Sequence, residues 1–297
     1  MNEDGQTILR LGLPKGRMEQ GTLRLLEDAG IQVRVSSRGY RPWLSLPGAD
    51  AKVLKPQNII EMVRAGSRHV GFAGADWVAE LGYEHDSNLV ELLDTGLDKV
   101  RVVVAAPERN LRDGKLHVPP GKTLVVASEL PRLAQRWIEQ KGVQAKVLRT
   151  YGATEVFPPD DADAIVDIAA TGDTLKANKL EVVDEVLTSS TRLYGHGPSL
   201  LKPEVRARVD ELVLLLGAAL EARHRAMVDL NVARNQLEAV LEVLPSLRQP
   251  TISDLRNEDG FAVRSAVPRE QLTTLIPELK RAGAEDIVVT TPTQLVR

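Results

Sequence analysis

Short apolar runs alternate with amphipathic stretches along the first two thirds of the chain. The apolar runs typical of buried strands are residues 8–13, 70–73, 100–106, 124–127, 145–148 and 164–170, with further strand candidates at 31–35, 182–187 and 192–194. Apolar side chains recur at helical spacing in residues 18–29, 56–65 and 130–141, and a glycine follows each stretch. Further helices are expected from Trp77 and from Thr174 to Leu180. The alternation predicts an α/β fold with a mainly parallel sheet.

The last third of the chain has a different pattern. A long amphipathic helix is expected from Pro203, with its apolar face formed by Val205, Val209, Leu212, Val213, Leu216 and Leu220. After it come a strand at 226–232, a helix at 236–244, strands at 251–254 and 261–267, a helix at 269–282 and a strand at 287–291. This order is the βαββαβ unit of ferredoxin-like domains. Its polar helix faces and its lack of clustered reactive side chains favour a regulatory or assembly role.

Composition narrows the classes of protein. The 297 residues are 43% hydrophobic, which predicts two or three domains with a sizeable core. The absence of cysteine excludes disulfides, thiolate nucleophiles and zinc–sulfur sites. A formal charge of −3 argues against a nucleic-acid partner, and the longest apolar run, 212–220, is too short to cross a membrane. Residues 1–7 are polar, unlike a secretion signal, so we expect a soluble cytoplasmic protein.

The segment from Asp163 to Leu175 is the strongest candidate for chemistry. An apolar strand leads into a turn of hydroxyl and glycine residues, and a helix is expected directly after it. Backbone amides at such a turn bind anions, Gly172 allows close approach, and the hydroxyls of Thr171 and Thr174 are further donors. With Asp167 upstream to accept hydrogen bonds from sugar hydroxyls, the segment fits a ribose 5-phosphate. An ordinary helix cap explains the same residues.

Four further segments carry charged residues that could bind a ligand, and two of them lie next to predicted strand ends. Lys15 and Arg17 follow the first strand, where α/β sheets bind ligands and where both could hold phosphates. Asp76 opens a helix after a glycine-rich strand end, so it is either a helix cap or a ligand contact. Lys55 belongs to a basic region that would suit a phosphate-rich substrate, and Glu155 precedes a Pro-Pro-Asp-Asp run that could hold Mg²⁺ through waters. The simpler explanations are a solvated turn for Lys15 and Arg17 and for the Pro-Pro-Asp-Asp run, a helix cap for Asp76 and a solvated surface for Lys55.

Taken in order, these segments resemble one family. Leu11-Gly-Leu-Pro-Lys-Gly-Arg17 resembles the N-terminal motif of ATP phosphoribosyltransferases, and 54–59 and 71–77 look like the next two blocks. Residues 163–175, continuing to Glu181, resemble the family's signature for phosphoribosyl pyrophosphate. The tail, with 250–252 and 266–269, looks like the regulatory domain of the long form. The resemblance spans nearly the whole chain.

The resemblance implies an architecture and a reaction. It implies two α/β lobes of the type II periplasmic-binding-protein kind, lobe I at 1–100 and 190–217 and lobe II at 101–189, with a ferredoxin-like regulatory domain at 218–297. It also implies that N1 of the ATP adenine attacks C1 of phosphoribosyl pyrophosphate and releases pyrophosphate, with Mg²⁺ on the pyrophosphate. No catalytic acid or base is assigned. A non-catalytic two-lobed binding protein or regulatory paralogue is the alternative.

The resemblance also implies sites. Phosphoribosyl pyrophosphate would be held by Asp167, Ala170, Thr171, Gly172, Asp173 and Thr174, and ATP or pyrophosphate by Lys15, Arg17, Lys55, Asp76 and Glu155. Asp173 departs from the family's pattern, which usually has a neutral or basic residue at this place, and a carboxylate beside a phosphate is repulsive unless its side chain turns away. Histidine would inhibit from a separate site that includes Asp229, Asn231, Thr251 and Leu255. A homo-oligomer, either a dimer or a hexamer, is expected.

Overall fold

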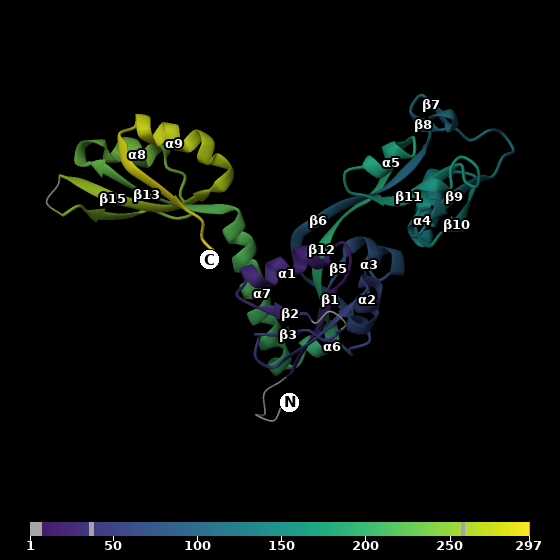
Figure 1. Cartoon of the computed structure of the whole chain (residues 1–297), viewed down its shortest axis with the longest axis horizontal. Helices are drawn as coiled ribbons and strands as arrows, with labels where there is room; N and C mark the ends of the chain where they lie inside the picture. Colours follow the sequence, from purple (N-terminus) through teal and green to yellow (C-terminus); the bar gives the residue numbers. More distant parts are fainter. Residues whose placement is uncertain (1–7, 36–38, 257–258, 297) are drawn as a thin grey trace. The chain divides into compact units, whose positions relative to one another are not determined.

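The computed structural model describes residues 8–35, 39–256 and 259–296, so the predicted polar N-terminus lies outside the described residues. The chain forms two compact units (Figure 1). The first unit comprises the described residues up to Leu23 together with Val33–Val209, and the second comprises Arg24–Gln32 and the residues from Asp210 onward. Each unit has its own sheet.

An eight-stranded mixed sheet runs through the first unit in the order β10-β9-β11-β6-β12-β5-β1-β4. One group of parallel strands contains β1 (Leu9–Pro14), β4 (Ala49–Leu54) and β5 (Val70–Gly74). The other contains β9 (Leu124–Ser128), β10 (Ala145–Arg149) and β11 (Ala164–Ala169). Two long strands, β6 (Leu89–Pro107) and β12 (Leu180–His196), lie between the groups and run antiparallel to their neighbours. The α/β prediction is confirmed, and only the two outer groups are parallel.

Several predicted elements differ from the observed ones. Strand β6 begins at Leu89 rather than near 100, and its first half escaped prediction because its apolar and polar residues do not alternate regularly. Strand β12 is continuous, whereas the sequence predicted two short pieces. The helix expected to reach Leu180 is only α5 (Asp173–Ala177), and Leu180 already belongs to β12. Two small hairpins, β2 (Val33–Arg34) with β3 (Trp43–Leu44) and β7 (Leu111–Arg112) with β8 (Lys115–Leu116), complete the unit's strands among the described residues.

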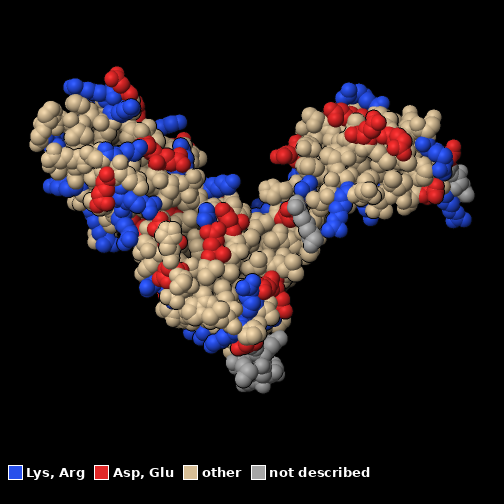
Figure 2. Space-filling view, turned by 180° about the vertical axis from the view of Figure 1, so that it is seen from behind, with Lys and Arg blue, Asp and Glu red and all other residues tan. Residues whose placement is uncertain are grey.

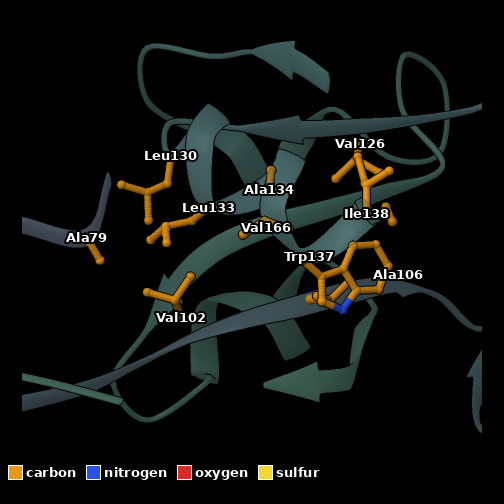
Figure 3. Packing of buried hydrophobic residues seen from close by; sticks show 12 residues of the cluster. Ala79, Val102, Ala106, Val126, Leu130, Leu133, Ala134, Trp137, Ile138 and Val166 are labelled. Carbon is orange, nitrogen blue, oxygen red and sulfur yellow. The ribbon is translucent and has the colours of Figure 1, made fainter. Parts of the chain in front are cut away.

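Helices α1 (Glu19–Asp28), α2 (Pro56–Arg64), α3 (Ala75–Leu81) and α4 (Pro131–Lys141) connect these strands. Helix α4 packs its apolar face on the sheet, with Leu133 and Trp137 against strand residues such as Val102 and Val166 (Figure 3). The Trp137 indole also donates a hydrogen bond to Asp184 on β12, at 2.8 Å. This core fixes the strand ends of the second parallel group.

Helix α6 (Gly197–Leu200) and the long helix α7 (Pro203–Arg223) follow β12. The second unit then contains β13 (Arg225–Ala233), α8 (Leu237–Val243), β14 (Thr251–Asp254), β15 (Gly260–Pro268), α9 (Leu272–Arg281) and β16 (Ala284–Thr290). Its antiparallel sheet has the order β14-β15-β13-β16, and both helices cover one face (Figure 1). The predicted βαββαβ order is confirmed.

The surface in Figure 2 carries basic and acidic side chains intermixed over both units, as the small net charge leads one to expect. Among the described residues, no helix combines the length and the apolar character needed to span a membrane. Because the two signs of charge are mixed over the surface, a binding site for an anionic ligand requires basic side chains that are gathered at one place.

Candidate active site

The carboxyl ends of parallel strands from both groups border one cavity in the first unit. Ligands of open α/β sheets bind at this end of the strands. The cavity has a volume of about 840 Å³, within the range of ligand sites. From the first group and its helices it is lined by Lys15, Arg17, Lys55, Trp77 and Glu80, and from the second by Glu129, Arg149, Tyr151 and Ile168.

The charged side chains of the cavity are mostly basic. Lys15, Arg17, Lys55 and Arg149 face two carboxylates, those of Glu80 and Glu129. The Glu80 carboxylate is engaged, because it accepts hydrogen bonds from the backbone amides of Arg132 and Leu133 at the start of α4, at 3.1 and 3.0 Å. Burial raises the pKa of Glu80 more than these two bonds lower it. The cavity is therefore suited to a ligand with several negative charges.

The turn after β1 brings two of the predicted cations to the cavity. Gly16 has a φ of +81°, a left-handed conformation that favours glycine, and the turn leads directly into α1. The amide of Lys15 donates to the carbonyl of Leu54 at 2.9 Å, which joins the end of β1 to the end of β4. Lys55 is the next residue after Leu54, so this pairing places Lys15 and Lys55 at the same edge of the sheet.

Arg17 is held by groups of the protein on one side. Its Nη1 donates to the backbone carbonyl of Asp98 at 2.7 Å, and its Nη2 lies 3.4 Å from Oδ2 of Asp76. The Asp76 side chain is fully buried, whereas 35% of the Arg17 side chain is exposed. Of this pair, only Arg17 lines the cavity.

Asp167 lies near the end of β11 beside two other carboxylates. Burial raises its pKa to about 6, the hydrogen bond from the Ile168 amide opposes this rise, and the charges of Glu155 and Glu129 add to it. The Ile168 amide donates to Oδ1 of Asp167 at 2.7 Å. The structure thus brings Asp167 and Glu155 within electrostatic reach of each other and of Glu129, which lines the cavity.

The hydroxyl–glycine turn follows β11 and is open to solvent. Gly172 has a φ of +83°, and Ala170, Thr171, Asp173 and Thr174 are exposed. The Thr171 hydroxyl donates to Oδ2 of Asp173 at 2.7 Å, so the carboxylate is tied within the loop. Because α5 has only five residues, its dipole is short, and the loop's own amides and hydroxyls are the available donors.

Sequence reasoning missed several residues of the cavity, notably Glu129, Arg149 and Tyr151. A signal for them exists. Glu129 lies two residues after the predicted strand 124–127, and Arg149 directly follows the strand 145–148. Both therefore lie within two residues of a predicted strand end, as does Lys15, which the sequence did single out.

The four predicted residues of the second unit lie on and beside its sheet. The side chains of Val228 and Leu230 on β13 are buried beneath α8 and α9, so Asp229 and Asn231 point to the opposite face. Asp229 accepts a hydrogen bond from Nε of Arg264, its cross-strand partner, and Arg264 is in turn opposite Thr251. Leu255 follows β14, and its amide donates to the carbonyl of Gly260 at 3.0 Å.

No group of three or more His, Asp or Glu side chains suited to a metal ion occurs in the part of the chain that the structure describes. The charges of Glu155 and Glu129 raise the pKa of Asp167, but the three carboxylates are not such a group.

Comparisons with known proteins agree with this architecture. The ATP phosphoribosyltransferase family model matches residues 55–217, and the HisG C-terminal domain model matches residues 222–292. The ATP phosphoribosyltransferase of Pelotomaculum thermopropionicum is 38% identical over 286 residues, covering 94% of this chain and 96% of the relative. That of Solibacter usitatus is 37% identical over 286 residues, covering 95% and 96%.

One solved structure adds a similarity of fold. It is the ATP phosphoribosyl transferase (HisG:HisZ) complex of Thermotoga maritima, at 25% sequence identity and a TM-score of 0.59. The similarity covers 71% of this chain and 99% of that one.

Proposed function

The chain belongs to the ATP phosphoribosyltransferase family, and from that premise we propose that the cavity of the first unit is where its two substrates meet. The protein is a pentosyltransferase of the first step of histidine biosynthesis. The observation that carries the assignment of the cavity is its excess of basic side chains, Lys15, Arg17, Lys55 and Arg149 against two glutamates, where the carboxyl ends of both groups of parallel strands border it. ATP and phosphoribosyl pyrophosphate are both polyanions, and such a cavity attracts them.

The reaction joins adenine N1 of ATP to C1 of the ribose. The lone pair of N1 forms the new bond, the bond from C1 to pyrophosphate breaks, and pyrophosphate leaves with the electron pair. Adenine N1 carries no proton, so its attack needs no general base. Catalysis then depends on orientation and on cations that stabilise the charge on the departing pyrophosphate. Lys15, Arg17, Lys55 and Arg149 supply such cations.

The loop after β11 would hold the ribose 5-phosphate. Gly172 keeps the backbone accessible, and Thr174 and the amides of residues 170–174 are the donors. The bond from Thr171 to Asp173 supports this role, because it ties the Asp173 carboxylate to a donor and reduces its repulsion of a phosphate. Asp167, when ionised, would accept hydrogen bonds from the ribose hydroxyls, with Glu155 tuning its ionisation.

Mg²⁺ would enter with the substrate. The pyrophosphate oxygens of phosphoribosyl pyrophosphate and water are good ligands for Mg²⁺, which keeps several waters in such complexes. The ion would accompany the pyrophosphate and stabilise its charge as it departs.

Histidine would inhibit from the second unit, at the sheet face that contains Asp229, Asn231, Thr251 and Leu255. The pair of Asp229 with Arg264 supports this proposal, because a carboxylate and a guanidinium side by side match the two charges of a free amino acid. Inhibition from a separate site requires coupling between the two units. A cytoplasmic homo-oligomer, dimer or hexamer, completes the proposal.

A matched pair of variants tests the place of the reaction. Arg149 lines the cavity, whereas Lys146 is an exposed cation on the same strand that does not line it. Arg149→Ala should raise the KM of ATP or of phosphoribosyl pyrophosphate at least about tenfold, the size of one lost charge-assisted contact. Lys146→Ala should leave both KM values unchanged. Equal KM values for the two variants would show that the reaction does not take place in this cavity.

A further inference from the structure

The buried carboxylate of Asp76 lies directly behind Arg17, and it is enclosed by donors. Its Oδ1 accepts hydrogen bonds from the Ser189 hydroxyl and the Trp77 amide, each at 3.0 Å. Its Oδ2 faces Nη2 of Arg17 at 3.4 Å. The Asp76 side chain has no exposed surface, so no part of this carboxylate can touch a ligand in the cavity. A buried charge of this kind is retained only with partners that compensate it.

Ser189 fixes the orientation of the Asp76 carboxylate. Its hydroxyl accepts from the Asp76 amide and donates to the Asp76 carboxylate, with 3.0 Å for each bond. Ser189 is itself buried on β12, where its rotation is restricted by packing. The Asp76 carboxylate is thereby fixed with one oxygen toward Ser189 and the other toward Arg17.

A second acceptor holds Arg17 from β6. Asp98 has a φ of +48°, and its backbone carbonyl accepts from Nη1 of Arg17 at 2.7 Å. The register between β6 and β12 shifts next to this position, between Ser189 and Thr191. The Thr191 hydroxyl donates to the Asp98 side chain at 2.8 Å and holds the shifted segment in place. Two hydroxyls of β12 thus fix the two partners of Arg17: Ser189 donates to Asp76, and Thr191 donates to Asp98.

We propose that Asp76 is a positioning residue for Arg17: together with the Asp98 carbonyl, it fixes the guanidinium so that its remaining N–H groups present a fork to a substrate polyphosphate. A guanidinium has five N–H donors, and the two protein acceptors occupy two of them. A long side chain that is not held would lose conformational freedom on binding, and this loss would weaken binding. This inference rests on the proposed function of the cavity. The buried Asp76 carboxylate cannot touch a ligand, but it can hold the Arg17 side chain that does.

The test is a double-mutant cycle in the full-length protein, with initial rates measured for ATP and for phosphoribosyl pyrophosphate. Asp76→Asn keeps the shape of the side chain and removes its charge. It should raise the KM of one polyphosphate substrate at least about tenfold while kcat changes less than about threefold. In an Arg17→Ala background, the same change should alter that KM by less than about twofold, because the residue it positions is gone.

Two outcomes would overturn the proposal. One is a wild-type KM for both substrates in Asp76→Asn, and the other is an effect of equal size in the Arg17→Ala background. If Asp76→Asn does not fold, Ser189→Ala takes its place in the cycle with the same two criteria, since it removes one hydrogen bond that holds the carboxylate and leaves the carboxylate itself in place. Asp50→Asn, which removes the partner of Arg68 at 2.7 Å, is the control for a lost ion pair away from the cavity and should leave both KM values unchanged.

Failure of the proposed function is distinguishable from failure of this inference. If the wild-type protein forms no adduct, the reaction assignment fails, and the cycle is then run on ATP affinity and phosphoribosyl pyrophosphate affinity by calorimetry. A loss of affinity in Asp76→Asn that disappears in the Arg17→Ala background supports the positioning role. Additive losses, or no loss, overturn it.

Discussion

Asp167 provides the sharpest test of the site's electrostatics, because its environment opposes its own charge. Burial, with the nearby charges of Glu155 and Glu129, raises its pKa from 3.8 to about 6. The folded protein therefore binds this proton more tightly than the unfolded chain does. The ionised carboxylate destabilises the fold above about pH 6, and the penalty disappears as the pH falls below about 4.

The size of the effect follows from the shift. One pKa unit corresponds to about 1.4 kcal/mol, so the penalty of the ionised form is at most about 3 kcal/mol. Asp167→Asn preserves an oxygen for the hydrogen bond from the Ile168 amide and removes the charge. It should therefore make the first unit up to about 3 kcal/mol more stable at about pH 8, with the gain vanishing near pH 4. Its activity should fall, because the ribose loses a charged acceptor.

The assay is urea unfolding followed by tryptophan fluorescence. All three tryptophans of the chain, Trp43, Trp77 and Trp137, belong to the first unit, so the signal reports that unit. Asp163→Asn is the matched control four residues away. Burial would raise the pKa of Asp163, but bonds from Lys122 at 2.5 Å and from the Val125 amide at 2.9 Å lower it further than burial raises it.

The two variants must therefore behave oppositely. Asp163→Asn should destabilise the unit at about pH 8, where the wild-type carboxylate is ionised and paired, and this loss should shrink in acid. An Asp167→Asn protein that is less stable than the wild type at pH 8 would refute the reasoning. So would a stability gain that does not change with pH.

Three other outcomes are expected. Gly172→Val should raise the KM of phosphoribosyl pyrophosphate about tenfold, because a φ of +83° is strained for a β-branched residue; an unchanged KM would remove the loop from the site. Leu133→Ala, at a fully buried position, should cost about 2–5 kcal/mol in urea unfolding, against less than about 1 kcal/mol for Leu201→Ala in the same unit, where the side chain is 84% exposed; similar losses would contradict the core described for α4. Asp229→Asn, which weakens the pair with Arg264, should require at least about tenfold more histidine for half inhibition, and an unchanged inhibition curve would place the effector elsewhere.

Strong periodicity explains what the sequence could predict. The helices at 56–64 and 131–141 begin with proline, carry apolar stripes and end at glycine or shortly before it, and the structure has them within a residue or two of the predicted ends. The βαββαβ order of the tail was equally clear. By contrast, the first half of β6 has no apolar alternation, since its pairing with β12 leaves many of its side chains in solvent. Such pairing is a tertiary property that a local window cannot reveal.

The site divides in the same way. The position of Lys15 after the first predicted strand pointed to a ligand-binding edge of the sheet, whereas Lys55 was noted only as part of a basic region, because the strand that ends at Leu54 was not predicted. The burial of Asp76 was not accessible, because it depends on Ser189, which is 113 residues away. The predicted end of the helix after Gly172, at Leu180, was also wrong. The helix ends at Ala177, and Leu180 belongs to β12, where it pairs with Pro107 of β6.

The most direct test of the account follows both products of the reaction at once. The full-length protein is incubated with ATP, phosphoribosyl pyrophosphate and Mg²⁺, and the phosphoribosyl-ATP adduct is measured by ultraviolet absorbance and mass spectrometry while pyrophosphate is measured by a coupled assay. The account predicts equal amounts of adduct and pyrophosphate, with formation of both slowed by Arg149→Ala at substrate concentrations near the wild-type KM. Binding of both substrates by the folded protein without any adduct would contradict it and would favour a two-lobed binding or regulatory protein.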